Sequence, residues 1–170
     1  EIMKEAILSL TEGDKKDVVI EEEGVTIQLT TTENQNNANT NKSTIRLGEC
    51  EDKIKEHYGI DKSESLLILK MDVYEEGLLI PKIEYEVYNP KTKKQLNLSI
   101  CEGIKINLVL PASINGDIDK YNSSSEFYND ICYIYTSNGT DITISDRQNE
   151  FNKNKMSLCE KNCVFKRYDL

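Results

Sequence analysis

Apolar and polar side chains alternate in several short runs between residues 25 and 110, and this alternation limits the fold more than any other feature of the chain. In the first run, polar residues separate Val25, Ile27 and Leu29, which is the period-two pattern of a strand with one buried face. Comparable runs cover residues 66–74, 82–87, 96–100 and 104–110. No helix of the right length for a crossover is predicted between these strands, so we expect them to be antiparallel. The sequence therefore predicts a mainly β fold, an antiparallel β-sandwich with a few short helices.

Shorter elements accompany these strands. The β-branched run 18–20 is predicted as a short strand, and ordered structure is expected to resume at residues 44–47. Residues 51–58 are predicted as a helix, because acidic residues occupy the first turn and Gly59 follows the end. Residues 1–11 are predicted as a short helix, within a segment 1–24 that serves as a linker or an edge element.

Two segments depart from the β pattern. Residues 32–43 are rich in Asn and Thr and hold almost nothing to bury, so we expect a flexible, solvated loop. In the last third, the series Ser123 to Glu126 and Ser145 to Gln148 have the form of capping boxes, which would begin helices ending near residues 131 and 154. We expect one domain over residues 1–170, closed by a disulfide-tied part from residue 112 onward.

The charge of the chain limits its partners. The net charge of −9 and the lack of clustered Lys and Arg argue against binding to nucleic acid. The longest apolar runs are far too short to span a membrane, so we expect no direct membrane insertion by this segment. The chain opens on Glu1 rather than Met, which we interpret as a segment of a longer protein.

Catalytic and metal-binding signatures are weak. The sole histidine, His57, makes a closed zinc set or a Cys–His catalytic pair improbable. No glycine-rich phosphate loop or serine-hydrolase motif occurs, so we expect no enzyme and no cofactor. A calcium site built from Asp130, Asp141 and Asp146 is the alternative, although no calcium-loop spacing supports it.

Four triplets have the form of N-glycosylation acceptors, at Asn41, Asn97, Asn122 and Asn138. About two such triplets are expected by chance in a chain so rich in Asn, Ser and Thr. All four fall in predicted loops or on predicted solvent faces, which agrees with passage through a secretory pathway.

Three segments of the last third, together with two upstream segments, carry a recognisable pattern. The three are Tyr128–Cys132, Gly139–Arg147 and Cys159–Cys163, and the upstream two are Leu47–Cys50 and Ile83–Tyr88. The pattern resembles a recurring part of large cysteine-rich surface proteins of protists, of the cysteine-repeat modular kind. The resemblance covers roughly residues 25–165. It implies an extracellular module beside cysteine-rich repeats, with further cysteines downstream.

Five cysteines leave one without a partner inside this segment if disulfides form, and buried free thiols are the alternative. From their order in the chain we predict Cys50–Cys101 and Cys132–Cys159, with Cys163 unpaired, out of fifteen arrangements.

These observations predict a non-catalytic extracellular module of a membrane-anchored or secreted surface protein, serving adhesion, recognition or spacing. Its partner would be a protein or glycan on another surface, or a neighbouring domain of the same chain. A juxtamembrane receptor domain that cleaves itself and an intracellular scaffold with free thiols are the alternatives.

Overall fold

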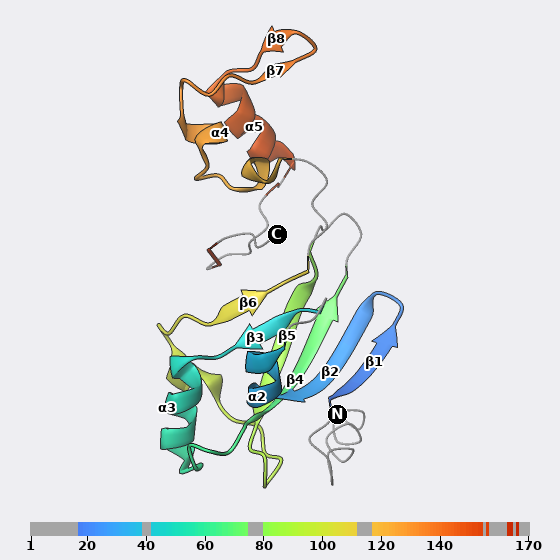
Figure 1. Cartoon of the computed structure of the whole chain (residues 1–170), viewed down its shortest axis with the longest axis vertical. Helices are drawn as coiled ribbons and strands as arrows, with labels where there is room; N and C mark the ends of the chain where they lie inside the picture. Colours follow the sequence, from blue (N-terminus) through green and yellow to red (C-terminus); the bar gives the residue numbers. More distant parts are fainter. Residues whose placement is uncertain are drawn as a thin grey trace. The chain divides into compact units, whose positions relative to one another are not determined.

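The computed structural model describes residues 17–38, 42–74, 80–111 and 117–154, together with residues 156, 163, 164 and 166. The chain divides into two compact units, Glu1–Pro111 and Ala112–Leu170, which are described separately here (Figure 1). The helix expected over residues 1–11, the glycosylation acceptor Asn41 and the cysteine Cys159 lie outside the described residues. None of the helices in the described part of the chain is long and apolar enough to cross a membrane.

The first unit is built on a four-stranded antiparallel sheet in the order β1-β2-β4-β5 (Figure 1). Its strands are β1 (Val18–Glu22), β2 (Val25–Thr31), β4 (Leu67–Val73) and β5 (Lys82–Tyr88). Strands β2, β4 and β5 coincide with segments that the apolar runs predicted as strands, and β1 coincides with the β-branched run predicted at 18–20. All neighbouring pairs are antiparallel, as expected.

Both faces of this sheet carry buried apolar side chains. On one face, which we call the α3 face, Ile68 and Val87 pack with Ile45 and with Ile54 of helix α3 (Glu49–Tyr58) in a single core cluster. On the opposite face, a second cluster is formed by Leu29, Leu67, Leu69 and Tyr88. The sheet is thus central to the unit, and several polar side chains on its α3 face are buried, namely those of Gln28, Thr30, Lys70 and Asp72.

A two-stranded antiparallel ladder joins β3 (Thr44–Arg46) to β6 (Asn107–Val109). The strand predicted at 104–110 is therefore shortened to three residues. The strand predicted at 96–100 is wrong, because a 3₁₀ helix, η1 (Leu98–Cys101), begins there. Asn97 Oδ1 accepts a hydrogen bond from Ser99 N at 2.9 Å, and this cap directs the backbone into the turn.

The loop expected over residues 32–43 is largely replaced by helix α2 (Thr32–Asn37). The hydroxyl of Thr31 caps it by accepting from Asn34 N at 3.1 Å. Gln35, only 1% exposed, accepts from Ile45 N at 3.0 Å and donates to Thr30 Oγ1 at 3.3 Å. A segment without apolar side chains is therefore held in place by hydrogen bonds to β2 and β3.

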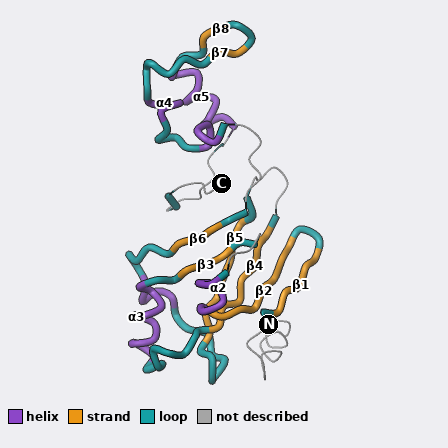
Figure 2. The backbone as a smooth tube through the Cα atoms, in the orientation of Figure 1, coloured by secondary structure: helices purple, strands orange, loops and turns teal. Residues whose placement is uncertain are grey.

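The second unit contains η2 (Ile118–Tyr121), α4 (Glu126–Asn129), the hairpin β7 (Thr136–Ser137) and β8 (Thr140–Asp141), and α5 (Ile144–Asn154) (Figure 2). Arg147, 5% exposed, donates to the carbonyl oxygens of Phe127, Tyr133 and Ile142 at 2.9, 2.8 and 3.0 Å. Its guanidinium carbon lies 5.1 Å from the centroid of the Phe127 ring. One buried arginine thus connects α4, the segment after it and α5.

Neither capping box forms as predicted. Helix α4 begins after Ser125, whose hydroxyl donates to Asp119 O at 2.7 Å rather than capping the helix. At α5 the box is shifted by two residues, because Thr143 Oγ1 accepts from Asp146 N at 3.2 Å and donates to Asp146 Oδ2 at 2.7 Å. Helix α4 nevertheless lies inside the segment where a helix was expected, and α5 ends at Asn154 as expected but begins earlier, at Ile144.

The predicted disulfide Cys50–Cys101 is confirmed, with a Cα–Cα distance of 5.3 Å. The predicted Cys132–Cys159 bridge is wrong, because Cys132 is a free, exposed thiol. It lies in a turn that is stabilised by a hydrogen bond from Cys132 N to Asp130 Oδ1, a local geometry that order along the chain does not reveal. Cys163, predicted to be unpaired, is in a disulfide whose partner is not among the described residues.

The fold class therefore differs in part from the expected mainly β fold. The strands are antiparallel and a disulfide is present, but helices hold as large a share of the described residues as strands do. The structure is a mixed fold of antiparallel sheets and helices rather than a mainly β one.

Candidate functional site

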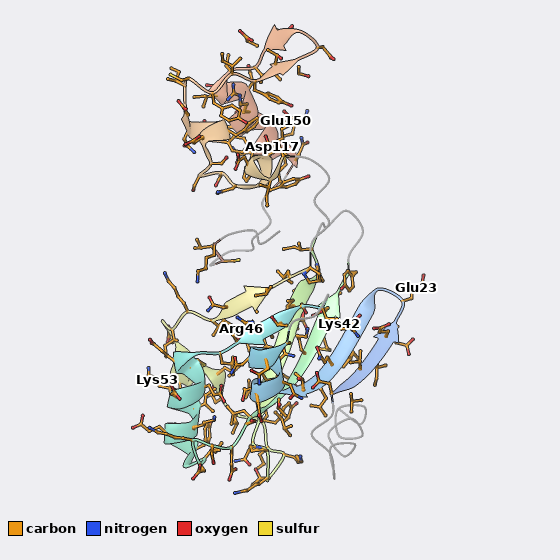
Figure 3. All side chains as sticks on the ribbon, viewed as in Figure 1. Glu23, Lys42, Arg46, Lys53, Asp117 and Glu150 are labelled. Atoms are coloured by element: carbon orange, nitrogen blue, oxygen red, sulfur yellow. A yellow bond between two sulfur atoms is a disulfide. The ribbon has the colours of Figure 1, made fainter. Side chains whose placement is uncertain are left out.

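A surface pocket of about 460 Å³ lies at the end of the main sheet where β1 turns into β2. The register of the sheet builds it, since Thr26 is paired with Glu21 on one side and with Asp72 on the other, so the three side chains share the α3 face. Lys42, which precedes β3, adds a fourth side chain (Figure 3). Among the described residues, the lining consists of Glu21, Glu22, Gly24, Val25, Thr26, Lys42, Asp72 and Tyr74.

Gly24 lets the β1–β2 turn approach Tyr74 beside the pocket. Its φ of +75° is a left-handed conformation that favours glycine in the β1–β2 turn. Its carbonyl oxygen accepts from Tyr74 N at 2.8 Å, and an added Cβ would lie 3.5 Å from Tyr74 O. The turn and the residue that follows β4 are thus fixed to each other beside the pocket.

Beneath the pocket lies a buried polar cluster of Ser43, Lys70 and Asp72, with exposures of 1%, 1% and 3%. The Lys70 ammonium donates to both the carbonyl and the hydroxyl oxygen of Ser43 and lies 3.4 Å from Asp72 Oδ2. The Ser43 hydroxyl in turn donates to Asp72 Oδ2 at 2.5 Å. Burial lowers the pKa of Lys70, and the charge of Asp72 acts against that shift.

Asp72 is the member of this cluster that also lines the pocket. Its Oδ2 atom is bonded to Ser43 and near Lys70, whereas its Oδ1 atom is buried and has no hydrogen-bond partner within the described part of the chain. A buried carboxylate oxygen without a donor is costly, by about 1–3 kcal/mol or more for a charged group. Such an atom at the base of a pocket is suited to accept a hydrogen bond from a ligand or from water.

The rim of the pocket carries more charge. Lys42 Nζ lies 3.0 Å from Glu21 Oε1, and these side chains are 43% and 66% exposed. The pKa of Tyr74 is raised by burial and then by the charges of Asp72 and Glu21, against the opposing effect of Lys42. The side chains around the Tyr74 hydroxyl therefore produce a net negative potential.

The contact between Ser43 and Lys70 brings a hydroxyl next to an amine of lowered pKa, the combination that a serine nucleophile with a lysine base requires. Ser43 is only 1% exposed and does not line the pocket, so a substrate in the pocket would not reach its hydroxyl. We therefore interpret this cluster as a structural support for Asp72.

The glycosylation acceptors occupy accessible turns where they are described. Asn97 is exposed, and Asn122 Oδ1 accepts from Ser124 N at 3.0 Å, as Asn97 Oδ1 does from Ser99 N. Asn138 is exposed at the β7–β8 turn with a φ of +52°. In both Asn97 and Asn122 the turn hydrogen bond uses the side-chain oxygen and not the side-chain nitrogen, which is the atom that a glycan would modify.

The alternative calcium site gains no support. Among the described residues, no group of three or more His, Cys, Asp or Glu side chains is placed to hold a metal ion. Asp130 accepts from Cys132 N, and Asp146 is bonded to Thr143. His57 contacts the Tyr58 ring edge-on at 4.8 Å in the last turn of α3.

Sequence reasoning missed the polar cluster. Lys70 and Asp72 interrupt the apolar run 66–74 at alternate positions on the side of Ile68, and this pair of opposite charges within a central strand is the signal that could have revealed it. The pocket itself depends on the pairing of β1, β2 and β4, which one sequence does not provide.

No protein-family model matches this chain, and neither does any curated protein or solved structure.

Proposed function

We propose that this chain is a non-catalytic extracellular module of a secreted or membrane-anchored surface protein, and that it acts in adhesion, recognition or spacing. The resemblance of its last third to cysteine-repeat modular surface proteins of protists is part of this proposal. Its partner is a protein or glycan on another surface or a neighbouring domain.

The observation that carries the proposal is the Cys50–Cys101 disulfide. It joins the buried first turn of α3 to the end of η1 across a sequence separation of 51 residues. Such bridges persist in oxidising compartments and are rare in the cytosol. A bridge that closes a loop of this size contributes about 2–4 kcal/mol to stability, which supports a structural rather than a redox role.

The glycosylation acceptors support the same location. Asn97 is exposed four residues before Cys101, on the surface of the first unit, and Asn138 is exposed in the second. A glycan at either position would extend into solvent without displacing a buried side chain.

The test is peptide mapping of native protein without reduction. We expect a linked Cys50–Cys101 peptide and a glycan on Asn97 or Asn122. Five free thiols together with unmodified acceptors would refute the extracellular location and favour an intracellular scaffold. Cleavage of the backbone in a longer form of the protein would instead favour the self-cleaving receptor domain.

A further inference from the structure

We propose that the pocket lined by Glu21, Thr26, Asp72 and Tyr74 binds a protonated primary amine, either a lysine side chain of a polypeptide or a free alkyl diamine. The carboxylates of Asp72 and Glu21 accept its hydrogen bonds. This inference concerns the pocket alone and stands whether or not the module is secreted.

The first argument is the unmatched acceptor. Asp72 is 3% exposed and lines the pocket, and within the described residues its Oδ1 atom has no donor. Lys70 and Ser43 hold the other carboxylate oxygen, so the side chain cannot turn away to solvent without losing those contacts. The pocket therefore holds a fixed acceptor that lacks a donor.

The second argument is the balance of charge. Among the residues that the structure describes, three carboxylates, those of Glu21, Glu22 and Asp72, line the pocket together with one ammonium, that of Lys42. The Lys70 ammonium lies 3.4 Å from the Oδ2 atom of Asp72, whereas the Oδ1 atom has no partner among the described residues. Burial is the largest cause of the raised pKa of Tyr74, and the charges of Asp72 and Glu21 add to it. A cationic donor is thus favoured over a neutral or anionic one.

The third argument concerns which cation fits. Calcium takes six to eight oxygen ligands, and the described residues contain no group of three acidic, His or Cys side chains able to hold a metal. An ammonium needs only hydrogen-bond acceptors, which Asp72 Oδ1 and the Glu21 carboxylate provide. Tyr74 is 52% exposed, so its ring is available beside the alkyl chain of the amine.

The ion pair at the rim does not block the site. Lys42 and Glu21 are both well exposed, and an exposed pair of this kind contributes little free energy. Glu21 can therefore exchange Lys42 for a ligand ammonium that also reaches Asp72, which gives the ligand a second, buried contact.

The test is an NMR titration of the full chain, labelled with ¹⁵N, in which the backbone amide signals of Gly24, Thr26 and Tyr74 are followed. The probes are 1,5-diaminopentane and a short peptide with a single lysine, and 1-pentanol is the neutral control. We expect saturable shifts of these three amides with an amine and none with pentanol. Whichever of the two amines binds more tightly shows whether the natural ligand is a lysine side chain of a polypeptide or a free diamine.

Two variants and a matched control complete the test. Glu21→Gln, a change at an exposed position, is expected to weaken amine binding by about tenfold, the value for losing one charge-assisted hydrogen bond. Asp72→Asn should abolish binding where the spectrum shows that it folds. Glu84→Gln removes the same charge from β5, where Glu84 pairs with Lys82, and should leave binding unchanged.

The proposal is overturned if sodium chloride at equal ionic strength reproduces the shifts, or if Glu21→Gln binds as well as the natural chain. Tighter binding of calcium chloride to the same amides would also overturn it, in favour of a metal site. None of these outcomes bears on the disulfide and glycan mapping that tests the extracellular location.

Discussion

Lys70 and Asp72 lie two residues apart on the same face of β4, with Nζ and Oδ2 separated by 3.4 Å and both side chains almost fully buried. A buried ion pair costs desolvation energy on both sides, and that cost is offset only where further hydrogen bonds satisfy both partners. Here Ser43 bonds to both members, which fixes the segment before β3 against the sheet. The pair therefore determines the position of the residues around the pocket.

Replacing Lys70 by Met is expected to destabilise the first unit by about 3–5 kcal/mol, because Asp72 would remain as a buried charge without a counterion. The free energy of unfolding in urea measures this loss. The matched control is Lys82→Met in the exposed Lys82–Glu84 pair, where the change should stay below about 1 kcal/mol. Similar losses in the two variants would show that the buried pair contributes no more than a surface pair.

Removing the disulfide by Cys50→Ala with Cys101→Ala is expected to lower the free energy of unfolding by about 2–4 kcal/mol. The bridge closes a loop in the unfolded chain and restricts its conformations, and the variant loses this restriction. Cys132→Ser is the control, because the Cys132 thiol is exposed and free. It should change stability by less than about 0.5 kcal/mol. A large loss in Cys132→Ser would mean that this thiol makes a stabilising contact.

Most strands of the main sheet were predictable because one face is apolar, and burial of that face leaves a period-two pattern in the sequence. Strand β4 differs, because Ile68 belongs to one core cluster and Leu67 and Leu69 to the other, so its start is a continuous apolar run. The same rule fails at residues 96–100. Leu96 is buried and Leu98 and Ile100 pack against the same cluster, so the alternation is real, but Asn97 turns the backbone into η1. Alternation reports which side chains are buried and not how the backbone is bonded.

Helix α2 and the residues that pair with Lys70 and Asp72 could not be predicted for a related reason. Gln35, Ser43 and Lys70 are buried through hydrogen bonds whose partners are distant in sequence. Polar side chains of this kind leave no periodic signal, and their composition alone resembles that of a solvated loop. The disulfide pairing failed in part because order along the chain says nothing of which way Cys132 points.

Stability is expected to fall as pH rises above about 10, the pKa of an unperturbed tyrosine. Burial, followed by the hydrogen bond and charge of Glu86, raises the pKa of Tyr88 well above that value. Its stabilising contribution is complete below pH 10 and is lost as pH rises toward the raised pKa, since only the unfolded chain ionises in that range. Urea unfolding at pH 8, 10 and 11 should show a smaller decline for Tyr88→Phe. An equal decline would show that other groups control the alkaline response.

Replacing Arg147 by Lys is expected to destabilise the second unit by about 3 kcal/mol, although the charge is kept. The guanidinium donates to the carbonyl oxygens of Phe127, Tyr133 and Ile142 in three directions, and a single ammonium at the end of a different stem cannot reproduce that geometry. Amide hydrogen exchange of residues in α4 and α5 measures the loss, since it reports on this unit separately from the first. Lys153→Arg on the exposed side of α5 is the control and should leave exchange unchanged. If Arg147→Lys exchanged as slowly as the natural chain, charge rather than directed hydrogen bonding would hold the two helices together.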